Sequence, residues 1–400
     1  GRPGNAVLIF ALAVHQGDLF AGTCEAGGDQ VGHVYRLDDQ GRWEDLGLPA
    51  GCNSVSALAE VQGGLYAGTA RYRLRGSALK DSENPKPGGQ VFRWKGGSSW
   101  EDCGTLPGSD CVAGLVVYRG SLYASSLYSP GMFRYLGGKN WESCGSPNGK
   151  RVEALGVWNG GLYATSYDSA EVYRYDGGER WTNLGRVGPA ENTQTYGFAV
   201  HEGNLFVSTW RTGRVFRFDG PDRWRDTGRL GEELEVMGMS VYNGKLYAGT
   251  LPLAEVYRFD GENQWANVGR LDHTPDVTYR RAWVMAVHRG RLVCGTLPSG
   301  KVLAYQAGRC ASWDHALGPG WHHLAAVRAA DRLRLHVDGR QVAESSPFQA
   351  KDYRLSLPNH QLRIGRGAND VFLGRIADVR IHGRALHSQE IQELAKSVSR

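Results

Sequence analysis

The chain of 400 residues lacks several features that would place it in common functional classes. No apolar run approaches the 18 or so residues of a membrane helix, so we expect no membrane span. The formal net charge is only +5, and no block of five like charges occurs, so we expect no nucleic-acid partner. The first ten residues lack the charged-then-apolar layout of a signal peptide, which indicates a mature or trimmed end.

Motifs for metals and redox chemistry are also missing. The seven cysteines include no C-x-x-C pair, and no H-E-x-x-H or EF-hand pattern appears, so we expect neither metal nor cofactor. Cys24 and Cys294 occupy related positions in the first and last repeats described below, and Cys103 lies close to Cys111 in sequence. For these pairs the sequence leaves a disulfide and buried free thiols open.

A repeated unit dominates the first three quarters of the chain. Its first half follows A-V-H-x-G-x-L-Y-A-G-T, as in residues 11–23, 57–69 and 238–250, and its second half follows V-Y-R-x-D-G-x-x-x-W, as in residues 172–181, 215–224 and 256–265. Two strands around an N-G-type turn and two around a D-G turn make four strands per unit. The units end at seven tryptophans: Trp43, Trp100, Trp141, Trp181, Trp224, Trp265 and Trp313. Seven four-stranded units predict a seven-bladed β-propeller, with the tryptophans packed between blades.

The repeat resembles the Kelch-like and Asp-box-like propellers. The turn Asp176-Gly177-Gly178-Glu179-Arg180-Trp181 matches the D-x-G-x-x-W core of an Asp box but lacks its leading Ser or Thr. That motif is structural in sialidase-type propellers, so the resemblance implies a fold and no particular chemistry. The recurring histidines His15, His201 and His288 share one turn position, and we interpret them as structural.

After Trp313 the pattern changes to GWHHLAAVR (320–328), RLRLHVDGR (332–340), LRIGRG (362–367) and GRIADVRIHGRAL (374–386). This run resembles the laminin-G-like, concanavalin A-type jelly roll over about half of that fold. The sandwich is either incomplete and packed on the propeller, which we favour, or interrupted by the propeller, with residues 1–10 supplying a strand. The predicted fold is therefore all-β: residues 1–10 form an N-terminal strand of the sandwich or of ring closure, residues 11–315 the seven-bladed propeller, and residues 316–400 a partial laminin-G-like β-sandwich.

Loop lengths indicate where a functional site lies. The turns inside the two hairpins of each unit are short, whereas the connections between the second and third strands, and between units, vary and open on one face. Function on a repeat scaffold tends to lie in such loops. The side chains that we predict to bind substrate there are Arg71, Tyr72, Arg75, Tyr128, Tyr167, Asp168, Trp210, Arg281 and Trp283.

Aromatic rings stack on sugars, and guanidinium groups hold carboxylates in bidentate geometry. We therefore expect a secreted, extracellular protein that acts on an acidic polysaccharide or glycan. Several polysaccharide lyases are seven-bladed propellers that use Tyr, His and Arg, and by that analogy we assign Tyr196, Arg211 and His33 as catalytic. A non-catalytic glycan-binding propeller and a protein-interaction propeller remain alternatives.

Overall fold

The computed structural model describes all residues except 29, 48, 350, 352–362 and 399–400. Residues 8–305 form seven consecutive antiparallel units, each with strands in chain order from the centre outward; single residue pairs, Cys24–Ser54 and Trp210–Glu235, join units one and two and units five and six. The first strands of successive sheets contact one another, and that of the seventh contacts that of the first, so the ring is closed. The observed architecture is thus a seven-bladed propeller.

The strands of blades one to four have the following bounds: β1 (Leu8–His15), β2 (Asp18–Cys24), β3 (Val34–Leu37), β4 (Trp43–Asp45); β5 (Ser54–Val61), β6 (Gly64–Ala70), β7 (Gln90–Gly96), β8 (Ser99–Thr105); β9 (Val112–Tyr118), β10 (Ser121–Ser126), β11 (Met132–Gly137), β12 (Asn140–Ser143); β13 (Leu155–Trp158), β14 (Gly161–Thr165), β15 (Glu171–Gly177), β16 (Arg180–Arg186). Two short 3-10 helices lie in the connections: η1 (Leu74–Ser77) and η2 (Pro147–Gly149).

The strands of blades five to seven are β17 (Gln194–His201), β18 (Asn204–Trp210), β19 (Arg214–Gly220), β20 (Arg223–Arg229); β21 (Glu235–Tyr242), β22 (Lys245–Leu251), β23 (Glu255–Gly261), β24 (Gln264–Arg270); β25 (Arg281–His288), β26 (Arg291–Leu297), β27 (Val302–Tyr305). The seventh sheet has three strands in the described part of the chain, where the repeat predicted four. Trp313 lies outside any strand and stacks on His315. At the free edge of β27, Gly1 and Val302 exchange both backbone hydrogen bonds, so the N-terminus takes part in closing the ring.

Tryptophans connect neighbouring blades through a repeated hydrogen bond. The indole N–H of Trp141 donates to the carbonyl of Cys103 in the preceding blade at 2.8 Å, and that of Trp181 donates to Cys144 at 2.9 Å. Three other tryptophans make the equivalent bond: Trp100, Trp224 and Trp265. Because each indole fills the space between two sheets while its one donor is satisfied, the repeat carries its own inter-blade packing. All seven cysteines are free thiols, six of them buried.

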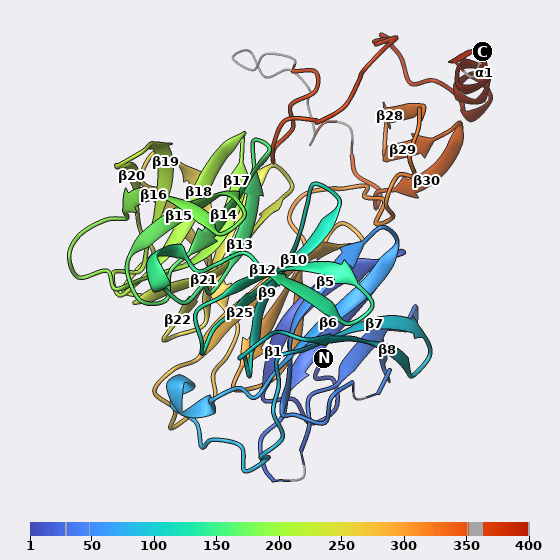
Figure 1. Cartoon of the computed structure of the whole chain (residues 1–400). Helices are drawn as coiled ribbons and strands as arrows, with labels where there is room; N and C mark the ends of the chain where they lie inside the picture. The colour runs from blue at the N-terminus through green and yellow to red at the C-terminus, as the bar shows by residue number, and fades with distance from the viewer. Residues whose placement is uncertain (29, 48, 350, 352–362, 399–400) are drawn as a thin grey trace.

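Within its described residues, the C-terminal segment (306–400) contains a three-stranded sheet and one helix. The strands are β28 (Leu324–Arg328), β29 (Leu333–Val337) and β30 (Arg340–Glu344), and the helix is α1 (Ser388–Val398). Figure 1 shows the segment, in orange to red, on one side of the propeller. It contacts the turn between β17 and β18, where the backbone N–H groups of Glu202 and Gly203 donate to the carbonyls of Ala368 and Asn369.

The two faces of the propeller therefore differ. The upper face in Figure 1 carries the short turns between the first and second strands of each blade, and the C-terminal segment contacts it. The lower face carries the variable connections, including the long one between β6 and β7 that contains η1.

Candidate functional site

The lower face is built from the first residues of the innermost strands. Backbone pairing aligns Gln194 with Trp210, Glu235 with Leu251, and Arg281 with Leu297. Equivalent register in three blades places these side chains at the same height around the axis. The scaffold is repeated, but the residues at this position are not, which is how a symmetric fold produces an asymmetric site.

An apolar core closes the axis at this level. The rings of Phe10, Tyr72 and Trp283 meet edge to face, with centroids 4.8 Å apart for Phe10–Tyr72 and 5.2 Å for Phe10–Trp283. Tyr72 comes from the long β6–β7 connection, whose backbone is held by Asn53: the Asn53 amide donates to the Tyr72 carbonyl and accepts from the Tyr72 N–H. Leu74 of η1 is fully buried in the same core. The β6–β7 connection thus covers the lower end of the axis.

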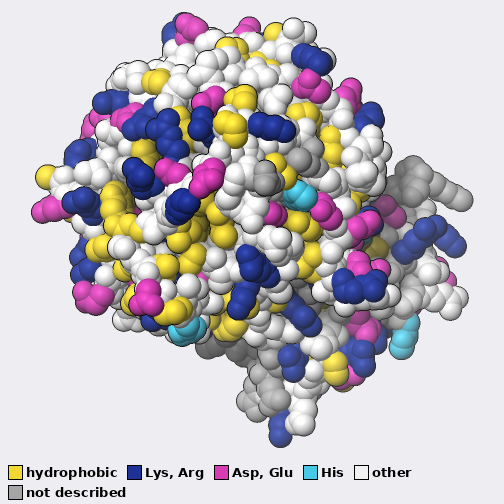
Figure 2. Space-filling view, turned by 90° about the horizontal axis from the view of Figure 1, so that it is seen from below, with side chains coloured by type: hydrophobic (Ala, Val, Ile, Leu, Met, Phe, Trp, Pro, Cys, Tyr) yellow, Lys and Arg dark blue, Asp and Glu magenta, His cyan; other side chains and the backbone are white. Residues whose placement is uncertain are grey.

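A pocket of about 230 Å³ lies beside this cover. The residues that line it are Asn53, Arg71, Tyr72, Arg73, Asp81, Ser82, Asp110 and Tyr128. The Arg73 guanidinium lies 4.5 Å from the centre of the Tyr128 ring, and the Tyr128 hydroxyl accepts from the Arg73 backbone N–H at 2.9 Å. Burial raises the pKa of Tyr128, so its hydroxyl stays protonated. Figure 2, which views the molecule from below, shows basic, acidic and hydrophobic side chains interspersed on this face.

Three ionisable side chains, Glu153, Glu235 and Arg281, lie at the axis next to the apolar core. Arg281 is 5% exposed and Glu235 is 2% exposed. The Arg281 guanidinium lies 5.0 Å from the centre of the Trp283 ring and donates to the Gly76 carbonyl of η1 at 3.4 Å. Burial raises the pKa of Glu235 to about 7, against the opposing effects of Arg281 and the Tyr196 hydroxyl. Burial and repulsion from Glu235 raise the pKa of Glu153 to about 8.

Most of the residues that we predicted to bind substrate meet at this axis. Tyr72 and Trp283 belong to the apolar core, and others pack against it: Tyr128, Tyr167, Tyr196 and Trp210. Arg281 stacks on Trp283, and Arg71 is exposed and lines the pocket. Two predicted residues have other roles. The Asp168 carboxylate pairs with Arg151, and Arg75 is exposed, with its backbone N–H donating to Asp81.

The structure does not bring the predicted catalytic residues together. His33 Nδ1 lies 2.7 Å from an Asp45 carboxylate oxygen, and its ring stacks on Tyr35, at the outer part of blade one. Arg211 is exposed, with its guanidinium 5.8 Å from the Trp210 ring. Tyr196 instead faces the charged groups at the axis, and burial raises its pKa. Among the described residues, no hydrogen bond, ion pair or ring contact joins any two of the three.

Sequence reasoning missed Glu153 and Glu235. Each stands at or just before an innermost strand, in RVEALGV (151–157) and ELEVMGM (233–239), and at the position of Glu153 the other copies of the repeat carry apolar or small residues. A carboxylate at a position that the repeat makes buried was the signal available. No group of three or more His, Cys, Asp or Glu residues able to hold a metal ion occurs in the described part of the chain. None of the described helices is long and apolar enough to cross a membrane.

Comparison with known proteins supports the two-part fold. A sequence profile of the concanavalin A-like lectin/glucanase superfamily, of the laminin-G type, matches residues 306–392. No curated protein sequence matches the chain. Virginiamycin B lyase from Staphylococcus aureus superposes with a TM-score of 0.57 at 10% identity, over 73% of this chain and 95% of that one.

Two further solved structures are similar in fold. YCF48 bound to D1 peptide gives a TM-score of 0.54 at 13% identity, covering 77% of this chain and 96% of that one. The extracellular domain of a putative hybrid two-component system from B. thetaiotaomicron gives 0.57 at 11% identity, covering 84% of this chain and 45% of that one. At such identities the likeness shows the fold alone: the chain is a β-propeller joined to a laminin-G-like segment.

Proposed function

We propose that this protein is a carbohydrate-active propeller, extracellular and secreted, that acts on an acidic polysaccharide through its lower face. The observation that carries the proposal is the pocket lined by Arg71, Arg73, Tyr72 and Tyr128, in which the Arg73 guanidinium packs on the Tyr128 ring. Guanidinium groups bind carboxylates in bidentate geometry, and tyrosine rings pack on sugar faces. The combination suits a uronate residue.

The reaction that we propose is β-elimination at such a uronate. An arginine neutralises the carboxylate and acidifies the neighbouring C–H, a base removes that proton, and an acid protonates the leaving oxygen as the double bond forms. Tyr128, which lines the pocket, supplies the acid through its hydroxyl, and Arg73 beside it supplies the positive charge. A carboxylate lining the same pocket, Asp81 or Asp110, takes the proton. This Arg–Tyr pair replaces the pairing of Tyr196 with Arg211 that we inferred from the sequence.

The test is to incubate the full chain with a panel of uronate polysaccharides and follow the ultraviolet absorbance of an unsaturated product. Tyr128→Phe and Arg71→Ala should lower the rate by at least tenfold, while Arg211→Ala, which alters an exposed side chain outside the pocket, serves as the matched control. If Arg211→Ala loses turnover while Tyr128→Phe and Arg71→Ala keep it, the catalytic roles belong to Tyr196 and Arg211 instead. Absence of product across the panel would remove the lyase reaction.

Binding without chemistry is the second candidate. It is favoured by the similarity to a propeller solved with a bound peptide, since that fold can present one face to a ligand without altering it. A glycan array would then separate a glycan-binding protein, which retains specific anionic glycans, from a protein-interaction propeller, which retains none.

A further inference from the structure

Three buried polar atoms at the propeller axis have no hydrogen-bond partner among the described residues. They are Oε2 of Glu153, Oε1 of Glu235 and Nε of Arg281. The side chains come from three parts of the ring: Glu153 precedes β13, and Glu235 and Arg281 begin β21 and β25. Their Coulomb interactions link them: Glu235 acts on both Glu153 and Arg281, and Arg281 acts on both carboxyl groups.

Buried polar atoms without hydrogen-bond partners need an explanation. A buried donor or acceptor left without a partner destabilises the folded state, and folded proteins retain few of them. Here two acceptors and one donor occur together at the axis, whereas two other blades carry the apolar side chains Leu8 and Cys111 at the position of Glu235. A ligand that donates twice and accepts once would satisfy all three atoms.

The charge of the cluster narrows the chemistry of that ligand. Burial and mutual repulsion raise the pKa values of Glu153 and Glu235 to about 8 and about 7, so near neutral pH the two carboxyl groups together carry about one negative charge or less. Arg281 supplies one positive charge, and Arg151 also acts on Glu153. Other titratable groups that interact with the cluster are the neutral hydroxyls of Tyr72, Tyr128, Tyr167 and Tyr196 and the neutral thiol of Cys111. A nearly neutral cluster favours a neutral polar ligand over a strong anion or cation.

We infer that Glu153, Glu235 and Arg281 form an axial subsite for two neighbouring hydroxyl groups of a sugar ring. The two hydroxyls donate to Glu153 Oε2 and Glu235 Oε1, and one of them accepts from Arg281 Nε. The ring of Tyr196, which packs against the apolar core and is partly exposed, supplies apolar surface for the sugar face. The inference rests on the proposed function, because it assumes a carbohydrate ligand, but it concerns a different set of residues from the lower-face pocket.

Access to the subsite involves the cover formed by η1. Glu153 and Tyr196 are partly exposed as whole residues, whereas the three unpartnered atoms are buried beneath them. The Arg281 guanidinium donates one long hydrogen bond of 3.4 Å to the Gly76 carbonyl, so η1 lies over this side chain. Tyr72 lines the lower-face pocket and also packs on Trp283, so a chain bound in the pocket lies next to the axial subsite.

The experiment uses the full chain and two probes: a short uronate oligosaccharide and the same oligosaccharide with its carboxylates reduced to alcohols. Affinities are measured by isothermal titration calorimetry. Arg71→Ala should weaken binding of the uronate probe alone, whereas Glu235→Ala should weaken binding of both probes by at least tenfold. Glu235→Gln, which keeps an acceptor oxygen, should bind the reduced probe within a few fold of the wild type. Circular dichroism establishes that each variant is folded.

A second measurement needs only the wild-type protein. Hydroxyl groups that donate to a carboxylate stabilise its ionised form, so binding of the reduced probe near pH 7 should release protons. Titration in two buffers of different ionisation enthalpy measures that release. Wild-type affinity for the reduced probe in folded Glu235→Ala, or binding without proton release, would overturn the axial subsite alone. Binding of neither probe by the wild type would overturn the proposed function together with it.

Discussion

The propeller and the C-terminal segment are both rich in β-sequence, yet they bury their apolar side chains to different extents. Each blade contributes an apolar cluster between neighbouring sheets, such as that around Leu246 and Tyr257. In the C-terminal segment, large apolar side chains remain at the surface: Leu373 and Ile381 are each 74% exposed, and Trp321 is 63% exposed. A sheet buries a face only against a second layer. Seven repeats supply that layer to one another, whereas the three strands and one helix in the described part of the C-terminal segment leave these apolar side chains uncovered.

The largest expected effect comes from removing a side chain between blades. Leu246→Ala deletes a fully buried side chain in blade six and should lower the free energy of unfolding by about 2–5 kcal/mol. Leu373→Ala is the matched control, and its effect should stay within about 0.5 kcal/mol. Urea denaturation followed by tryptophan fluorescence measures both. Equal losses would show that the C-terminal segment has a packed core of its own.

The buried carboxyl groups of the propeller should make its stability depend on pH. The pKa of Glu235 is raised from its ordinary value near about 4.3 to about 7, so the folded protein holds this proton more tightly than the unfolded chain does. Its contribution to stability is therefore present at low pH and declines as the pH rises from about 4.3 through about 7. Glu235→Gln should remove this decline. The free energy of unfolding of the variant minus that of the wild type should therefore be larger at pH 8 than at pH 4.5, by on the order of 1–3 kcal/mol.

Thermal melts of the wild type and Glu235→Gln across this pH range provide the measurement. The conservative substitution at an exposed position, Glu262→Gln, is the control and should leave the pH profile of the wild type unchanged. A parallel pH dependence in the wild type and Glu235→Gln would contradict the raised pKa.

A smaller effect is expected from the inter-blade hydrogen bonds. Trp181→Phe keeps an aromatic ring between blades but removes the N–H that donates to the Cys144 carbonyl, and should cost about 1 kcal/mol. Trp321→Phe changes an exposed side chain of the C-terminal segment and should be neutral. If the two variants unfold at the same denaturant concentration as the wild type, the repeated indole bond contributes packing alone.

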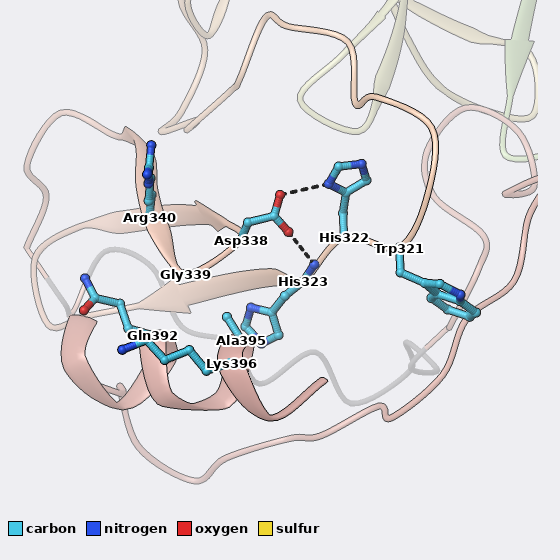
Figure 3. Close-up of a pocket in the computed structure, with 9 residues that line it drawn as sticks. All are labelled: Trp321, His322, His323, Asp338, Gly339, Arg340, Gln392, Ala395 and Lys396. Carbon is cyan, nitrogen blue, oxygen red and sulfur yellow. Dashed lines mark hydrogen bonds and ion pairs between the residues drawn. The ribbon is translucent and has the colours of Figure 1, made fainter. Parts of the chain in front are cut away.

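The smallest effect concerns the exposed ion pair of the C-terminal segment. His322 Nδ1 lies 2.9 Å from Asp338, beside a pocket of about 550 Å³ lined by residues of the β29–β30 turn and of α1 (Figure 3). The hydrogen bond to Asp338 raises the pKa of His322, so its stabilising effect is present at low pH and is lost as the pH rises through the raised pKa. His322→Gln should lower the melting temperature slightly when it is measured below pH 6 and leave it unchanged at pH 8. A larger decrease at pH 8 than below pH 6 would assign His322 a packing role.

The repeat made most of the fold predictable. Alternating apolar residues, N-G and D-G turns and a terminal tryptophan specified the hairpins and the blade count, because those signals are local and occur many times. The fourth strand of blade seven was predicted at Trp313 and is not observed; Gly1 pairs with β27 at that edge instead. Pairing between the two ends of a chain has no local sequence signal.

The candidate site was predictable in part. Loop lengths identified the lower face, and aromatic residues there, including Tyr72 and Trp283, do meet at the axis. The grouping of Tyr196 with Arg211 and His33 was not observed, since adjacency in one blade does not determine which way a side chain points relative to the axis. Glu153 and Glu235 were missed because a single carboxylate in an apolar strand resembles an ordinary variation of the repeat.

By itself, the sequence determined that this protein is a ring of seven β-sheets with its variable loops on one face, because period and turn chemistry are properties of neighbouring residues. Only the tertiary structure decided that the β6–β7 connection covers the axis, and that Glu153, Glu235 and Arg281 lie together there with unpaired atoms. The physical reason is ring closure. It brings together residues more than a hundred positions apart, and the desolvation that raises their pKa values exists only once the blades have packed.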